Sequence, residues 1–180
     1  MNKLEEIEEL KKLKYRYFRH LDCKQFDAML ELFAEGASTS YNSGEHSYGG
    51  KAAIREFFDT AMSSSKILHQ HQGHHPEIEL TSDTTATGVW YMDDTVHILE
   101  HNLKIRGNGI YWDEYVKVDG KWKILHTGYE RLWEYSEVLP ENSLTFKTMF
   151  DEDELERRAK RVRRDGEQPL VYWEAQAEES

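Results

Sequence analysis

Cysteine and proline are scarce in this chain, and long apolar runs are missing. The single cysteine, Cys23, cannot form an intrachain disulfide, so we expect a fold without a disulfide framework in a reducing, cytoplasmic compartment. No stretch approaches the ~18 consecutive apolar residues of a membrane-spanning helix, so we expect no membrane span. The first residues also lack the basic and then apolar plan of a signal peptide.

Basic residues are fewer than acidic ones. The chain has 23 Lys and Arg against 34 Asp and Glu, which gives a formal net charge of −11 at pH 7. This charge repels phosphates, so we expect no nucleic-acid partner. Apolar residues make up only 38% of the 180 residues, but the 12% that are aromatic each bury a large area. The length suits one domain with its own core.

The hydrophobic period changes along the chain. A period of 3.6 predicts helices over Leu4–His20, Phe26–Phe33 (ended by Gly36) and Ala52–Met62. A hairpin is expected to start at Ala37–Tyr41 and another to turn at Asp119-Gly120. From residue 67 a period of two predicts strands over Ile67–Gln72, Glu77–Leu80, Ala86–Met92, Val96–Leu103, Gly109–Val118 and Trp122–Trp133.

Helices followed by a series of antiparallel strands predict an α+β fold, with the three helices packed on one face of a curved sheet that encloses a cavity. We assign residues 1–140 to this domain. Residues 141–180 form a C-terminal extension that is not an independent domain, with a charged helix predicted over Asp151–Arg164.

The helix that ends near Asp22 carries an acid beside its apolar stripe. Leu10, Leu13, Tyr17 and Leu21 recur at spacings of three and four, and Asp22 falls at the edge of that stripe. A carboxylate near a core is costly to bury without a partner. Asp22 either pairs with a polar group, for which His71 is the candidate, or simply ends the helix at the surface.

Four of the nine histidines lie within seven residues: His69, His71, His74 and His75. On a strand, His69 and His71 point to the same face. A neutral imidazole oriented by a carboxylate suits a general base. Two other interpretations stay open: metal ligation, which the helical N-terminal region disfavours, and structural hydrogen bonding, which we favour for His74 and His75.

Four segments together resemble the SnoaL-like branch of the nuclear-transport-factor-2-like fold, and are most similar to the bile-acid 7α-dehydratases and, more distantly, to scytalone dehydratase. They cover roughly residues 10–135 in order: Lys14–Asp22, His71–Ile78, Thr84–Asp94 and Tyr111–Arg131. The resemblance implies a cone-shaped fold, but this fold hosts enzymes and non-enzymes alike.

The resemblance also implies roles for individual residues. Tyr17, Asp22 and His71 match the tyrosine, aspartate and histidine of the dehydratase site, which pairs Asp22 with His71. Asp94, which matches a polar position that lines the cavity, is added to them as a fourth catalytic residue. Tyr41 and Arg131 match polar positions that line the cavity, and we include Tyr91, Trp112 and Tyr129 as aromatic substrate contacts, with no metal ligand among them.

The function expected from these residues is that of a cofactor-independent dehydratase, a carbon–oxygen lyase that eliminates water from a small apolar hydroxylated substrate such as a steroid or polyketide hydroxy-ketone. Two alternatives remain: an isomerase or dehydrohalogenase that uses the same base, and a non-catalytic protein that binds apolar ligands. By family analogy we expect a homo-oligomer, with a trimer favoured. The chain departs from the bile-acid enzymes at His20 and Val89, and His97–Asn108 has little similarity to them.

Overall fold

The computed structural model describes residues 2–141 and 143–151. By its internal contacts the chain divides into two compact units, Met1–Leu139 and Pro140–Ser180. The fold and the site belong to the first unit. Nearly all of the charged helix predicted over residues 151–164 lies outside the described residues.

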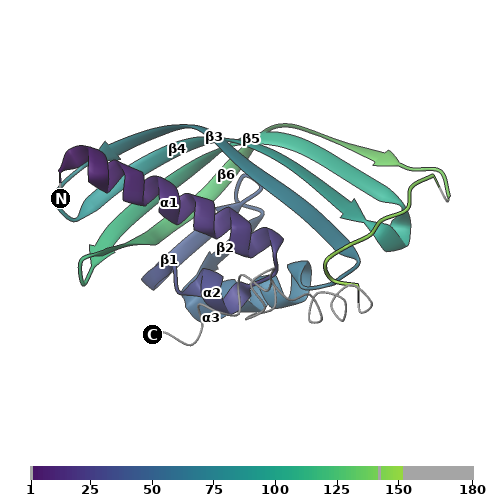
Figure 1. The fold of residues 1–180 in the computed structure, drawn as a ribbon, viewed down its shortest axis with the longest axis horizontal. Helices are drawn as coiled ribbons and strands as arrows, with labels where there is room; N and C mark the ends of the chain where they lie inside the picture. Colours follow the sequence, from purple (N-terminus) through teal and green to yellow (C-terminus); the bar gives the residue numbers. More distant parts are fainter. Residues whose placement is uncertain (1, 142, 152–180) are drawn as a thin grey trace, which may run out of the picture. The chain divides into compact units, whose positions relative to one another are not determined.

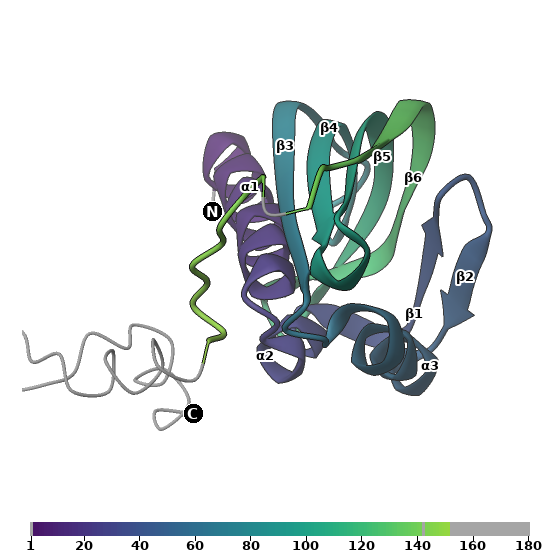
Figure 2. The same cartoon turned by 90° about the vertical axis from the view of Figure 1, so that its right-hand side faces the viewer.

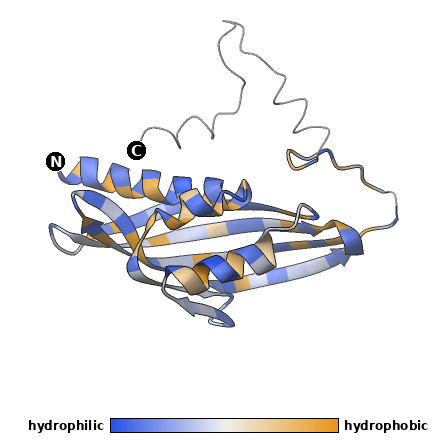
Figure 3. Ribbon diagram, turned by 90° about the horizontal axis from the view of Figure 1, so that it is seen from below, coloured by the Kyte–Doolittle hydropathy of each residue, from blue (hydrophilic) through white to orange (hydrophobic). Residues whose placement is uncertain are grey.

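Three helices and a π-helical turn belong to the first unit. Helix α1 spans Lys3–Asp22, α2 spans Phe26–Leu30, and α3 spans Lys51–Phe57 and continues into the π-helical turn η1, Phe58–Met62. Helix α1 starts at a capping box, in which the Asn2 side chain accepts from the backbone of Glu5 and the Glu5 side chain accepts from the backbone of Asn2. Along α1, hydrophobic and hydrophilic residues alternate as an amphipathic helix requires (Figure 3).

Six strands form one curved sheet in the order β2-β1-β6-β5-β4-β3. Their bounds are β1 Phe33–Tyr41, β2 His46–Gly49, β3 Ile67–Leu80, β4 Thr85–Ile98, β5 Leu103–Val118 and β6 Lys121–Val138. Only the β1–β6 pair is parallel; the other neighbours are antiparallel. Helix α1 lies across one face of the sheet, and α2 and α3 lie beside β1 (Figures 1 and 2). The predicted α+β cone is therefore confirmed.

Several predicted boundaries were wrong. The helix expected to reach Phe33 ends at Leu30, and Gly36, with φ of 72°, lies in an irregularity of β1 instead of ending that helix. The strand predicted over Val96–Leu103 does not exist as such, because β4 runs on through Asp93 and Asp94 to Ile98 and turns at Leu99–His101. Asp94 is buried, so the alternation of inward and outward side chains continues through this part of β4.

The two predicted segments Ile67–Gln72 and Glu77–Leu80 form a single strand, β3. Its pairing with β4 shifts between His74 and Glu77. Pro76 lies inside this shift, because proline cannot donate a ladder hydrogen bond. The predicted turn at Asp119-Gly120 is confirmed: both residues have positive φ, 50° and 76°, as a tight hairpin turn between antiparallel strands requires.

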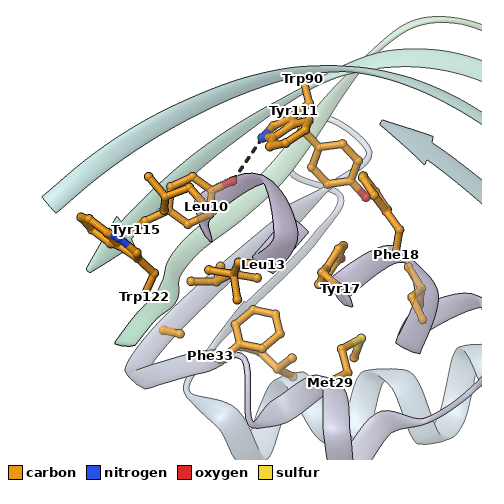
Figure 4. Close-up of a cluster of buried hydrophobic side chains, with 14 of the residues drawn as sticks. Leu10, Leu13, Tyr17, Phe18, Met29, Phe33, Trp90, Tyr111, Tyr115 and Trp122 are labelled. Atoms are coloured by element: carbon orange, nitrogen blue, oxygen red, sulfur yellow. Dashed lines mark hydrogen bonds between the residues drawn. The ribbon is translucent and has the colours of Figure 1, made fainter. Parts of the chain in front are cut away.

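The core lies between α1 and the sheet. Leu10, Leu13 and Tyr17 of α1 face Phe33 of β1 and the large aromatics of β4 and β5 (Figure 4). Trp90 is completely buried, and its Nε1 donates to the hydroxyl of Tyr115 at 3.1 Å. Burial of each such side chain contributes about 2–3 kcal/mol, so the high aromatic content offsets the low apolar fraction. No helix among the described residues is long and apolar enough to cross a bilayer.

Candidate active site

The last residue of α1 meets the middle of β3. Asp22 Oδ1 lies 2.7 Å from His71 Nδ1, and Asp22 Oδ2 accepts from the backbone N–H of His71 at 2.9 Å. Gly73 allows this approach of helix to strand, since a Cβ there would lie 2.4 Å from the Phe18 ring. Phe18 in turn lies parallel to the His71 imidazole at 6.5 Å. Both ends of the pair are thus held by backbone and packing.

The hydrogen bonds define the state of the pair. Burial acts to raise the pKa of Asp22, but the hydrogen bonds from His69 and His71 outweigh it and lower that pKa. A carboxylate can only accept, so Nδ1 of His71 carries the hydrogen and Nε2 holds the free lone pair. This arrangement suits proton abstraction by Nε2.

His69, which the sequence analysis placed on the same face without assigning it a role, is a third member of the cluster. Its Nδ1 lies 3.2 Å from Asp22 Oδ1, and its side chain is fully buried. The ligand atoms of Asp22, His69 and His71 lie within 4.8 Å of one another, a spacing from which a metal ion can be bound. The His-x-His spacing carried this signal, but only the fold shows that both imidazoles share one carboxylate.

Two predicted phenols lie together further along α1 and β1. The hydroxyls of Tyr17 and Tyr41 are 2.9 Å apart. Burial raises the pKa of both phenols well above the usual value, so they stay protonated and can donate. Tyr111 packs edge-on against both Tyr17 and Tyr129. The concave side of the sheet therefore holds protonated hydroxyls within a largely apolar surrounding.

Asp94 and Arg131 form an ion pair next to His71. Asp94 is the β4 residue paired with His71 in the sheet register. Both of its oxygens accept from the Arg131 guanidinium, Oδ2 at 2.9 Å. Burial acts to lower the pKa of Arg131, but Asp94 outweighs it and the pKa is raised. Gly107 makes room, since a Cβ there would lie 2.3 Å from the guanidinium.

The structure does not bring Tyr91 and Trp112 to this site. Side chains alternate along a strand, and it is Trp90 and Tyr111 that point to the core. Tyr91 is 47% and Trp112 is 52% exposed, on the opposite face of the sheet. Tyr91 and Trp112 are therefore not brought together with His71, and their role as substrate contacts stays a prediction. Trp112 instead lines a pocket of about 310 Å³ with Ser40, Ser43, His126, Gly128, Tyr129 and Glu130.

A second buried polar cluster went unnoticed in the sequence. Lys14 and Asp113 are both fully buried, with Nζ 2.8 Å from Oδ2, and Thr127 bonds to both. The ammonium also lies 3.7 Å from the centre of the Tyr111 ring. Burial lowers the pKa of Lys14 to about 8. The spacing of Lys14 from Leu10 and Tyr17 places it on the apolar stripe of α1, but lysine is rarely fully buried without a partner, and the sequence does not identify Asp113 as that partner.

Comparison with known proteins agrees with this architecture. The profile of the SnoaL-like domain family matches residues 2–128, so the chain belongs to that family. Among solved structures it is similar to a scytalone dehydratase-like protein from Novosphingobium aromaticivorans, with 20% identity, TM-score 0.69 and coverage of 76% of this chain and 91% of that one.

Two further structures show the range of proteins that share the fold. One is the hexachlorocyclohexane dehydrochlorinase LinA-type3 from Novosphingobium barchaimii, with 17% identity, TM-score 0.67 and coverage of 81% of this chain and 96% of that one. The other is ActVI-ORFA from Streptomyces coelicolor, with 15% identity, TM-score 0.60 and coverage of 70% and 96%. At these identities the similarity is one of fold.

Proposed function

We propose that the protein is a cofactor-independent hydro-lyase that removes water from a bulky hydroxy-ketone, steroid-like or polyketide-like. The observation that carries this proposal is the hydrogen bond between Asp22 and His71 Nδ1, which leaves Nε2 free to act as a base. The paired hydroxyls of Tyr17 and Tyr41 supply protonated phenols in the same domain. A positioned general base of this kind typically contributes about 10²–10⁴-fold to rate.

In the proposed reaction, His71 Nε2 takes a proton from the carbon next to the carbonyl. The electron pair moves onto the carbonyl oxygen, and Tyr17 donates a hydrogen bond to the enolate that forms. Return of the electron pair forms the carbon–carbon double bond and expels the hydroxyl. That hydroxyl leaves as water with a proton from Tyr41, and the imidazolium of His71 returns its proton through solvent to Tyr41.

Tyr41 fits the role of proton donor better than Asp94. Both oxygens of Asp94 are engaged by Arg131, and a paired carboxylate accepts hydrogen bonds and does not donate them. Tyr41, by contrast, keeps its proton because burial raises its pKa. Asp94 and Arg131 then hold the polar side of the site, and Arg131 with the neighbouring Tyr129 contacts the substrate.

A second candidate keeps the same base and changes the leaving group. The fold similarity to a dehydrochlorinase supports loss of halide as an alternative to loss of water, and proton return to another carbon would give an isomerase. The site chemistry is common to all three, because the leaving group belongs to the substrate. A protein that only binds apolar ligands is the third candidate.

The test is a ligand screen with mass spectrometry. Wild type and His71→Ala are incubated with 3-oxo steroids, hydroxylated polyketide aromatics and their dehydrated products, and thermal shifts are recorded in parallel. We expect wild type alone to remove the mass of one water. Stabilisation without a mass change in either protein would favour the binder or the isomerase, which proton exchange in deuterated water separates.

We further propose a cytoplasmic homotrimer. The outer face of the sheet exposes Tyr91, Trp112 and Trp133 at 47%, 52% and 49%, and apolar surface of this kind is commonly covered by another protein surface. Light scattering at several concentrations tests the assembly; a monomer throughout would contradict it.

A further inference from the structure

The lysine that follows α1 bonds to the buried histidine of the site. Lys24 has φ of 58° just after the end of the helix, and its side chain reaches His69 of β3. Its Nζ donates to the carbonyl of Met62 at 2.6 Å and lies 3.2 Å from His69 Nε2. Lys24 therefore connects the ends of α1 and η1 with the strand that carries the base.

The chemistry of an ammonium fixes the tautomer of His69. A lysine ammonium has donors and no acceptor, so the ring nitrogen it contacts must offer a lone pair. Nε2 of His69 is therefore unprotonated, and Nδ1 carries the hydrogen that Asp22 Oδ1 accepts. The order of donation is Lys24 to His69 to Asp22.

Two imidazoles thus share Asp22, and only one of them is able to act as a base. His69 and His71 both approach Oδ1, at 3.2 Å and 2.7 Å. The Nε2 of His69 is occupied by Lys24, and the side chain is fully buried. Its pKa is lowered by burial, with smaller contributions from His71 and Lys24.

We propose that Lys24 and His69 are positioning residues. Lys24 keeps the His69 imidazole neutral, so that the proton taken from the substrate goes to His71. This proposal rests on the proposed function for its kinetic consequence, but the proton arrangement it describes does not depend on any substrate.

The groups that face His69 come from three directions. Asp22 and Lys24 come from the end of α1, and His71 lies two residues along β3. On β4 the residue paired with His69 is the apolar Val96, and the titratable side chain on that face is Asp94, which is paired with Arg131. Removal of the Lys24 charge therefore takes away the one cation that contacts His69 Nε2 among the described residues.

The first experiment needs no substrate. In the full chain labelled with ¹⁵N, we expect His69 to show a protonated Nδ1 and a bare Nε2 that persists below pH ~6, where a free histidine takes up a proton. Lys24→Met should let Nε2 take up a proton at higher pH than in wild type, while Lys24→Arg should leave the wild-type pattern. An Nε2–H tautomer in wild type, or an unchanged titration in Lys24→Met, would overturn the proposal.

The kinetic experiment uses a matched pair at His69. His69→Leu removes the donor to Asp22, and His69→Asn keeps an N–H near the position of Nδ1. Because the His69 side chain is fully buried and its Nε2 contacts Lys24, we expect His69→Leu to lower kcat roughly 10-fold, the worth of one hydrogen bond to a charged group, with KM unchanged and most of the loss restored in His69→Asn. Equal losses in both variants, or a change in KM alone, would contradict the positioning role.

The two proposals fail separately. If His71→Ala keeps wild-type turnover, the proposed function is wrong, whereas the tautomer of His69 can still be measured. If the tautomer is wrong and His71→Ala is inactive, the base assignment stands and the role of Lys24 and His69 does not.

Discussion

Asp94 and Arg131 face each other across the sheet with both carboxylate oxygens bonded to one guanidinium, directly beside the register position of His71. The pair is largely buried, with side-chain exposures of 4% and 16%. A planar, two-point contact of this kind fixes the carboxylate in place. The pair therefore supports the site, and we expect its removal to lower the stability of the fold.

Arg131→Met should strongly destabilise the protein. It leaves Asp94 buried without its cation, and breaking a buried pair in this way costs about 3–5 kcal/mol. Urea unfolding gives the free energy. The control is Arg106→Met, because Arg106 pairs with Asp93 on the exposed face at 3.2 Å and its loss should leave the free energy of unfolding nearly unchanged. Equal effects of the two substitutions would contradict the assignment.

The buried pair of Lys14 and Asp113 has an exposed counterpart of the same length. Lys14–Asp113 and Lys12–Glu9 both measure 2.8 Å, but the first pair is fully buried. We expect Lys14→Met to destabilise the protein by about 3–5 kcal/mol and Lys12→Met to leave its stability nearly unchanged.

Asp113→Ala should cost at least as much as Lys14→Met, because Tyr115 and Thr127 also donate to this carboxylate. Thermal and urea unfolding measure all three variants. A loss for Lys14→Met as small as that for Lys12→Met would show that the core does not depend on this pair.

His71→Ala should lower turnover by about 10²–10⁴-fold while the fold survives, because it removes the base and leaves the packing of β3 in place. The control is His74→Ala, since His74 pairs with the outward-facing Tyr91 on the other face and should leave the rate unchanged. Steady-state kinetics on a substrate found in the screen measures both. Near-wild-type turnover of His71→Ala would rule out the base.

Stability should fall in acid through Asp22. Its pKa is lower in the folded protein than its usual value because of the hydrogen bonds from His69 and His71, which outweigh burial. A group of this kind stabilises the folded state above its unfolded pKa, about 3.9, and the stabilisation is lost as pH falls through the folded value. Asp22→Asn should therefore flatten this part of the stability curve, as measured by thermal unfolding from neutral pH downward. A parallel decline in wild type and variant would contradict it.

The sequence was sufficient for the fold class, with helices preceding strands, and, together with the resemblance to the dehydratases, for the pairing of Asp22 with His71. The edge position of Asp22 on α1 left its partner open, and the resemblance to the dehydratases supplied His71. The α+β cone follows from the change of period near residue 67, because a switch from 3.6 to two is the signature of helices followed by strands.

Other features of the site could not be predicted from the sequence, for physical reasons. Trp90-Tyr91 and Tyr111-Trp112 are adjacent aromatic pairs, so alternation alone leaves undetermined which member is buried. Lys14 lies on the apolar face, and a buried lysine becomes acceptable only when a carboxylate 99 residues away reaches it. The link from Lys24 to His69 depends on a left-handed residue at a helix end, which no local pattern indicates.

The parallel pairing of β1 with β6 has a consequence for folding during synthesis. β1, residues 33–41, lies between β2 and β6 in the sheet, and β6 comprises residues 121–138. The backbones of β1 and β6 come so close that a Cβ on Gly128 would lie 2.3 Å from the Ser40 carbonyl oxygen. During synthesis β1 therefore emerges long before the strand that completes it. With so large a loop to close, nearly the whole domain must leave the ribosome before β1 can pair with β6.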